Sequence, residues 1–204
     1  CSVVYHLSLI ILLYRDAHES FGGFEFDYIF VSAQRRRGEM EKIMEKILFE
    51  IEMQDGNVMK GELYPEVAPI TVENFVNLIK NNFFDGLIFH RVIPGFMIQG
   101  GGYDTDMKEH PAASIKGEFA SNGVTNNLKH TRGVLSMART MVKDSASSQF
   151  FIMHADAPHL DGDYAAFGLI TEGLEEVDKI ANVKRSPWND MPNEPQVIKT
   201  MKLL

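Results

Sequence analysis

The feature that most constrains the fold of this chain is a series of short apolar runs, many of them rich in β-branched residues. They lie at residues 46–53, 57–64, 87–93, 96–99, 133–137, 150–153, 165–170 and 197–203. Runs of this length and composition are typical of β-strands. Two further segments, residues 70–80 and 173–180, carry the period of a helix. Many strands with two isolated helices predict a mostly antiparallel β-barrel or sandwich rather than a doubly wound sheet.

The first two runs are predicted to form a hairpin. Residues 46–53 and 57–64 partly alternate between apolar and polar side chains, and Asp55-Gly56 lies between them as a turn. Pro69 then precedes the first helical segment, at the position where its missing N–H costs least. Within that segment, apolar residues recur at helical spacing: Val72, Phe75, Val76 and Ile79.

The first 39 residues differ from the rest of the chain. They hold neither a helical nor a strand period for long, and they end in Arg35-Arg36-Arg37-Gly38-Glu39, which a purine-rich ribosome-binding site would encode. Met40 follows directly. We therefore expect residues 1–39 to be an N-terminal extension that is disordered or an artefact of upstream translation. The alternative is a genuine extension that is disordered or peripheral to a membrane. Residues 40–204 have the size of one domain.

Charge and cysteine content exclude several classes of function. The chain carries 20 Lys and Arg against 28 Asp and Glu, a net charge of -8, so it has no excess positive charge to neutralise a nucleic-acid backbone. Cys1 is the only cysteine, which excludes an intramolecular disulfide. The longest apolar run, Leu7–Leu13, is far shorter than the roughly 20 residues that cross a bilayer. We expect a cytoplasmic protein without nucleic-acid or membrane partners. Export or lipid anchoring through Cys1 is the alternative.

Motifs for a metal or a cofactor are absent from the sequence. The seven histidines are scattered, without a pair at i, i+4 or a His-Glu-x-x-His motif. The run Gln99-Gly100-Gly101-Gly102 lacks the Lys-Ser/Thr of a phosphate-binding loop, and Ser147-Ser148 lacks the flanking glycines of a nucleophile elbow. We therefore expect no metal, no cofactor, and neither nucleotide-dependent nor hydrolase chemistry.

Four sequence blocks carry a family resemblance. They are Phe89–Gly101, Gly133–Ala138, Ser147–Ile152, and Leu160–Gly162 followed by Phe167-Gly168. In type, order and spacing these blocks resemble the cyclophilins, and in particular their bacterial branch, over residues 47–204. The resemblance implies a closed antiparallel eight-stranded barrel capped by two α-helices, with a peptide groove on its outer face. It also implies a peptidyl-prolyl cis/trans isomerase, which accelerates rotation about X–Pro bonds during protein folding.

That reaction makes a specific demand on the site. The prolyl amide has a rotation barrier of about 18–20 kcal/mol because its C–N bond has partial double-bond character. When the bond twists, the nitrogen regains a lone pair, so a fixed donor aimed at it stabilises the transition state selectively. Arg91 in the first block is the candidate catalytic residue, because its guanidinium stays charged and presents several donors in a rigid plane. A surface arginine in an ion pair is the alternative interpretation.

The resemblance also implies which residues form the peptide groove. Its apolar walls are formed by Phe96, Met97, Phe151 and Leu160. The polar members are Gln99 and Gln149, and the backbone of Ala138 and Arg139 pairs with the extended substrate. Phe96 and Met97 are adjacent, so in a strand they would point to opposite sides and one of them would be core. Placing both in the groove therefore depends on the resemblance alone.

Three groove positions depart from the best-known eukaryotic members of the family. His159 replaces a tryptophan whose indole donates a hydrogen bond to cyclosporin, Tyr164 replaces a histidine, and Arg139 replaces an asparagine. Because the large indole surface is lost, we expect retained isomerase activity but weak binding of cyclosporin-type ligands. A histidine at 159 would also allow the groove to respond to pH, although an uncharged spacer is the simpler interpretation.

The alternative function belongs to another class of protein. A proline-peptide binding module or chaperone could use the same groove without essential turnover. Arg91 favours the enzyme, since a pure binding module has no need of a donor to a twisted amide. In either case we expect a monomer whose partners are proline-containing peptides and unfolded or partly folded proteins.

Overall fold

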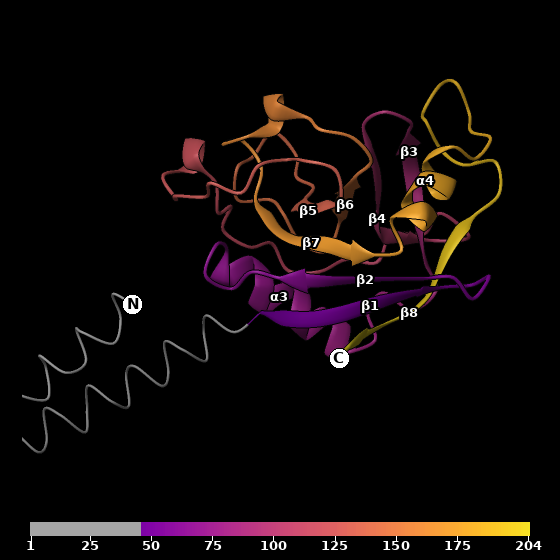
Figure 1. Ribbon diagram of the computed structural model, residues 1–204, viewed down its shortest axis with the longest axis horizontal. Helices are drawn as coiled ribbons and strands as arrows, with labels where there is room; N and C mark the ends of the chain where they lie inside the picture. The colour runs from indigo at the N-terminus through magenta and orange to yellow at the C-terminus, as the bar shows by residue number, and fades with distance from the viewer. Residues whose placement is uncertain (1–45) are drawn as a thin grey trace, which may run out of the picture. The chain divides into compact units, whose positions relative to one another are not determined.

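The computed structural model describes residues 46–204, so the prediction for residues 1–39 lies outside the described part of the chain. Eight strands of this part close into an antiparallel barrel in the order β1-β2-β7-β5-β6-β4-β3-β8 (Figure 1). Their bounds are Ile47–Met53 (β1), Val58–Leu63 (β2), Leu87–Ile93 (β3), Met97–Asp104 (β4), Val134–Met137 (β5), Phe150–Met153 (β6), Ala166–Glu172 (β7) and Gln196–Leu203 (β8). The helices are α3 (Pro69–Lys80) and α4 (Leu174–Ala181). The predicted fold class is confirmed, and closure decides between barrel and sandwich.

The predicted hairpin forms from β1 and β2, which pair in antiparallel register. Its turn uses Gly56 at φ +88°, a left-handed conformation that glycine adopts without a steric penalty. The Asp55 carboxylate accepts a hydrogen bond from the Asn57 N–H at 3.1 Å and stabilises the turn. Buried and more exposed positions alternate along β1, so Phe49 and Ile51 point into the barrel.

Aromatic side chains fill the barrel interior. The ring of Phe75 from α3 lies among the rings of Phe49 in β1, Phe150 in β6 and Phe167 in β7, with centroids 5.0 to 6.1 Å apart. Edge-to-face pairs of this kind contribute about 0.5–1.5 kcal/mol each beyond the area they bury. Since β1 and β6 are four places apart in the order of eight strands, one helix side chain connects opposite sides of the barrel. The interior is a packed core, so a peptide must bind outside it.

Both α-helices are short and pack one face onto this core. In α3 the buried apolar residues are those predicted from the sequence period: Val72, Phe75, Val76 and Ile79. The first turn of α3 has no side-chain cap of its own. Instead the buried Glu118 carboxylate accepts from the N–H groups of Ile70 and Thr71 at 3.1 and 2.8 Å. Within residues 46–204, no helix has both the length and the apolar character needed to span a membrane.

The neighbouring strands β3, β4, β6 and β5 position the candidate site. Their inward-pointing residues belong to the buried core: Val92, Ile98, Leu135 and Ile152. The register places four outward-pointing residues in one row across these strands: Arg91, Gln99, Phe151 and Ser136. A second outward row lies two residues further along: Ile93, Met97 and Met153. Strand alternation thus creates an outer face that combines a charged residue, an amide and apolar side chains.

Candidate active site

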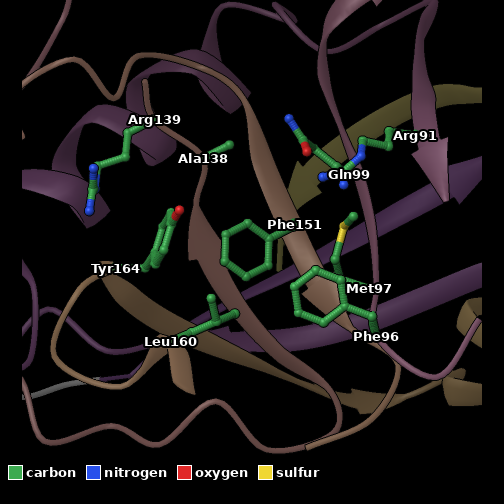
Figure 2. Close-up of a pocket in the computed structure, with 9 residues that line it drawn as sticks. All are labelled: Arg91, Phe96, Met97, Gln99, Ala138, Arg139, Phe151, Leu160 and Tyr164. Carbon is green, nitrogen blue, oxygen red and sulfur yellow. The ribbon is translucent and has the colours of Figure 1, made fainter. Parts of the chain in front are cut away.

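A cavity of about 170 Å³ lies on this outer face (Figure 2). Nine of the residues named from the sequence line it: Arg91, Phe96, Met97, Gln99, Ala138, Arg139, Phe151, Leu160 and Tyr164. They come from the β3–β4 hairpin, the residues that directly follow β5, strand β6, and the segment before β7. Pockets for drug-sized ligands usually measure about 300–1,000 Å³. The cavity therefore suits one ring-sized group better than a cofactor.

One wall of the cavity is apolar. Met97, Phe151 and Leu160 are all buried, with 8% or less of their surface exposed. In Figure 2 the Phe151 ring stands between Phe96 and Met97 on one side and Tyr164 on the other. Phe151 and Tyr164 meet edge to face, with ring centroids 5.9 Å apart. A wall of aromatic and aliphatic carbon is suited to a proline ring.

The turn before β4 explains how two adjacent residues both reach the cavity. β4 begins at Met97, so Phe96 lies in the turn and strand alternation does not apply to the pair. Hydrogen bonds with His154 hold this turn: the Gly95 N–H donates to His154 Nδ1, and the His154 N–H donates to the Phe96 carbonyl, both at 2.9 Å. Phe96 and Met97 can therefore both face the cavity, although two adjacent residues within a strand would point to opposite sides.

Two glutamine amides form the polar edge of the site. Gln99 Nε2 donates to Gln149 Oε1 at 3.1 Å. Gly102 makes room for this pair, because a Cβ at that position would lie 2.5 Å from Gln149 Cγ. Gln149 itself lines a second cavity of about 200 Å³, which shares Gln99, Ala138 and Arg139 with the first. Gln149 thus lies beside the predicted pocket and contacts it through Gln99.

Arg91 lies directly opposite Gln99 in the β3–β4 pair, and Figure 2 shows its guanidinium beside Gln99. The side chain is 43% exposed, so a bound peptide can reach it. Its Nε lies 3.9 Å from Asp190 Oδ2. A guanidinium held in this way keeps further N–H donors that can serve the cavity.

A buried hydrogen-bonded network lies behind the Phe151 ring. His130 stacks on Phe151 with ring centroids 6.1 Å apart, and its Nδ1 and Nε2 each lie 3.0 Å from Asp161 Oδ1 and Ser136 Oγ, respectively. Burial lowers the pKa of His130, so at neutral pH Nδ1–H donates to the carboxylate and Nε2 accepts from the hydroxyl. The order matches a Ser-His-Asp triad, but Ser136 is 0% exposed and cannot reach a substrate. The network supports the Phe151 ring.

Arg139 forms a positively charged rim beside the cavity. Its guanidinium carbon lies over the rings of Tyr164 and Phe119, 4.7 and 5.0 Å from their centroids. Its Nε and Nη2 donate to the Asp163 carbonyl at 3.1 and 2.8 Å. Cation–π contacts and hydrogen bonds together hold this side chain in one orientation.

His159 lies at the rim rather than in the cavity. Its ring stacks on Phe96 with centroids 5.7 Å apart and planes 26° apart, and the residue is exposed. The Ala138 N–H, predicted to lie in the peptide-pairing segment, donates to the Gln149 carbonyl at 2.9 Å. A peptide that pairs with Ala138 and Arg139 must therefore use the other backbone groups of this segment.

Several residues at the site were missed by sequence reasoning. Asp190 contacts Arg91, and the second cavity is lined in addition by Glu109, Thr140 and Ser145, which lie outside the four sequence blocks. Their residue types are those of ordinary surface loops, so no local signal in one sequence distinguishes them. Only the fold brings them to the groove.

Comparison with known proteins identifies the family. Residues 48–203 match the family described as "Cyclophilin type peptidyl-prolyl cis-trans isomerase/CLD". A peptidyl-prolyl cis-trans isomerase of Acinetobacter baylyi is 53% identical over 147 residues, which cover 69% of this chain and 75% of that protein. Peptidyl-prolyl cis-trans isomerase B of Bacillus subtilis is 47% identical over 130 residues, which cover 64% of this chain and 87% of that protein.

Solved structures show the same architecture. A cyclophilin-type peptidyl-prolyl cis-trans isomerase of Cryptosporidium parvum matches with a TM-score of 0.67 and 27% identity, over 78% of this chain and 98% of that chain. A structure of a Cryptosporidium parvum enzyme of this type in the presence of the dipeptide Ala-Pro gives a TM-score of 0.65 and 28% identity, over 77% and 98% of the two chains. The chain therefore belongs to the cyclophilin-type peptidyl-prolyl cis-trans isomerase family and is an isomerase of X–Pro peptide bonds.

Proposed function

We propose that this isomerase holds the proline ring in the apolar cavity while Arg91 donates a hydrogen bond to the nitrogen of the twisted amide. One observation carries the proposal. Arg91 and Gln99 stand opposite each other in the register, and both line the cavity whose wall is Phe151. The donor and the ring pocket therefore belong to one rigid outer face of the barrel, which keeps their separation constant during bond rotation.

The electrostatic step needs no covalent intermediate. In the planar amide the nitrogen lone pair is delocalised into the carbonyl, so it accepts poorly. At the twisted geometry the lone pair is localised, and the charged Arg91 donor binds it better than it binds either planar isomer. A donor of this kind, acting only in the transition state, typically contributes about 3–4 kcal/mol. This free energy lowers the rotation barrier directly.

The glutamine pair supplies the contact to the substrate carbonyl in this proposal. Gln149 Oε1 already accepts from Gln99 Nε2, so we assign the contact with the substrate carbonyl to the Gln149 Nε2 donor. Fixing the carbonyl on one side of the bond while the ring stays in the pocket leaves rotation about C–N as the motion between them. The Ala-Pro dipeptide used with the Cryptosporidium enzyme is the smallest ligand of this class.

The substrates that we propose are X–Pro segments of unfolded or partly folded proteins. The cavity lies on the outer face of the barrel and Arg91 is 43% exposed, so an extended chain can enter without passing through the core. The second cavity, which begins at Gln99 and Arg139, offers room for a residue next to the X–Pro pair. Recognition by extended backbone favours clients that have lost their tertiary structure.

The test is the rate of isomerisation of a proline peptide by the wild type and by Arg91→Ala. We expect kcat/KM to fall about 10²–10³-fold, the cost typical of removing one electrostatic donor to a transition state. Lys80→Ala, which removes a positive charge at the C-terminal end of α3, is the control and keeps the wild-type rate. An unchanged rate in Arg91→Ala refutes this mechanism. No rate in the wild type as well would favour a proline-peptide binding module or chaperone.

A further inference from the structure

The segment between α4 and β8 lies against the edge of β3. β3 pairs with β8 at Ile88 and Phe89, opposite Val197 and Gln196. Further along β3, the Val92 N–H donates to the carbonyl of Asp190 at 2.9 Å. The loop thus satisfies a backbone N–H on the edge of β3 beyond the end of the β8 pairing. It also holds Asp190 next to Val92, the neighbour of Arg91 in β3.

Local hydrogen bonds hold Asp190 in a defined conformation. Its N–H donates to the Ser186 carbonyl at 3.1 Å, and the Ser186 N–H donates to the Met191 carbonyl at 2.8 Å. An isolated antiparallel bridge joins Arg185 to Pro192 at the base of this loop. Asp190 itself adopts φ +56°, a left-handed conformation that aspartate and asparagine tolerate better than most residues.

The Asp190 carboxylate lies between two guanidinium groups. Its Oδ1 is 3.3 Å from Arg185 Nε, and its Oδ2 is 3.9 Å from Arg91 Nε. The contact involves Arg91 Nε and leaves the two terminal nitrogens, Nη1 and Nη2, free to donate into the cavity. Figure 2 shows the guanidinium beside Gln99. Since both ion pairs are partly exposed, they contribute little to the stability of the fold.

We propose that Asp190 is a positioning residue: it orients the Arg91 guanidinium toward the twisted amide, from a loop that lies outside the barrel strands. The inference rests on the catalytic role proposed for Arg91. A long side chain that is 43% exposed samples many rotamers when nothing holds it. Because the Asp190 backbone is tied to β3 itself, its carboxylate fixes the arginine relative to the strand that carries it.

The variant Asp190→Asn tests this role. Asparagine keeps the shape of the side chain and tolerates the left-handed backbone, so the loop is preserved while the charge is lost. We expect kcat to fall about tenfold, since misplacing a catalytic group costs rate steeply, with KM changed less than twofold. Glu172→Gln removes a carboxylate from another exposed ion pair, with Lys60 at 3.2 Å, and should keep the wild-type kcat.

A double-mutant comparison separates positioning from a merely structural role. In an Arg91→Ala background, Asp190→Asn should leave the residual rate unchanged, because there is no guanidinium left to orient. An equal fall in both backgrounds would overturn the proposal, as would a wild-type kcat in Asp190→Asn alone. If Arg91→Ala itself keeps full activity, the catalytic assignment of Arg91 fails first, so the two failures are distinguishable.

A measurement on the unmodified enzyme covers the case in which Asp190→Asn does not fold. Salt screens exposed ion pairs, so kcat of the wild type, followed by exchange NMR on a proline peptide, should fall as ionic strength rises. Lys80→Ala should show the same dependence as the wild type. A kcat independent of salt in both proteins would count against an electrostatic role for Asp190.

Discussion

At two positions, His159 at the rim and Tyr164 in the cavity lining, we expect the groove of this isomerase to differ from that of the best-known eukaryotic cyclophilins. The His159 ring is exposed and stacks on Phe96, whereas Tyr164 is covered by the Arg139 guanidinium and packs edge to face on Phe151. At the residue scale, an imidazole on Phe96 preserves a flat rim but offers less apolar surface than an indole. The consequence concerns large ligands that extend beyond the proline pocket.

Cyclosporin should therefore inhibit this enzyme weakly, above the submicromolar range. The variant His159→Trp adds an indole donor and apolar area, and we expect it to tighten inhibition about 5- to 30-fold, which corresponds to roughly 1–2 kcal/mol. Inhibition constants from the peptide isomerisation assay provide the measurement. His159→Phe, which supplies a ring without the N–H, should gain less. Submicromolar inhibition of the wild type would contradict this expectation.

At the scale of elements, β4 shows how one strand combines a pocket wall with a close backbone approach. Its first residues, Met97 and Gln99, face the cavity, and the glycines that follow let neighbouring elements approach. Gly102 is the position that matters for the site, because the Gln149 side chain occupies the space of a Cβ. The absence of a side chain at Gly102 therefore allows Gln149 to occupy its position beside β4.

Gly102→Ala should displace Gln149 and break its hydrogen bond with Gln99. We expect kcat/KM to fall several-fold, by about as much as in Gln149→Ala, since one net hydrogen bond corresponds to roughly 0.5–1.5 kcal/mol. The double variant should add little to either single change. Additive losses would show that the new methyl group disturbs something other than Gln149, and crystallographic or NMR inspection of the Gln149 side chain gives an independent check.

At the scale of the whole molecule, buried histidines make stability depend on pH. His90 packs edge to face on Tyr103 with centroids 4.9 Å apart, and its Nδ1 is buried without a hydrogen-bond partner among the described residues. Burial, with a smaller effect of the Arg91 charge, lowers the pKa of His90 to about 4. The unfolded chain binds this proton near its ordinary value of 6.5, so the folded state loses stability as pH falls from about 6.5 toward 4.

Urea unfolding at neutral and at mildly acidic pH should reveal this loss. The His90 contribution is at most about 3 kcal/mol, from the difference between the two pKa values. His90→Phe keeps the edge contact with Tyr103 and should reduce the dependence between pH 6.5 and 4, while the contribution of His130 remains. The pKa of Asp178 is lowered from its ordinary value of 3.8 by its hydrogen bond to Arg132. This carboxylate therefore changes stability only as pH falls below about 3.8. An unaltered profile in His90→Phe would refute the assignment.

Much of the fold could be predicted from local patterns. The hairpin around Asp55-Gly56, the helix that begins at Pro69 and the strands at residues 87–93 and 150–153 match the structure, because apolar period and turn residues are local properties. The predicted strand at 96–99 is Met97–Asp104 in the structure. Its extension was missed because the glycine run carries no apolar alternation.

The candidate site divides in the same way. Arg91, Gln99 and Phe151 stand in recognisable sequence blocks, and the structure brings them into one row. Asp190 and the His130 support behind Phe151 had no such signal, since a loop aspartate and a lone histidine are ordinary residues until a partner is known. Their roles come from contacts between segments that are distant in the chain.

By itself, then, the sequence determined the strand and helix types, the chemical class of the groove residues and, through its four blocks, the family. Local patterns left closure of the sheet and the shared cavity of Phe96 and Met97 to the family resemblance, and the structure shows both. Only the tertiary structure decided that Asp190 faces Arg91. The physical reason is that periodicity and turn chemistry act over a few neighbouring residues, whereas closure and ion pairing depend on which distant segments the packed core places side by side.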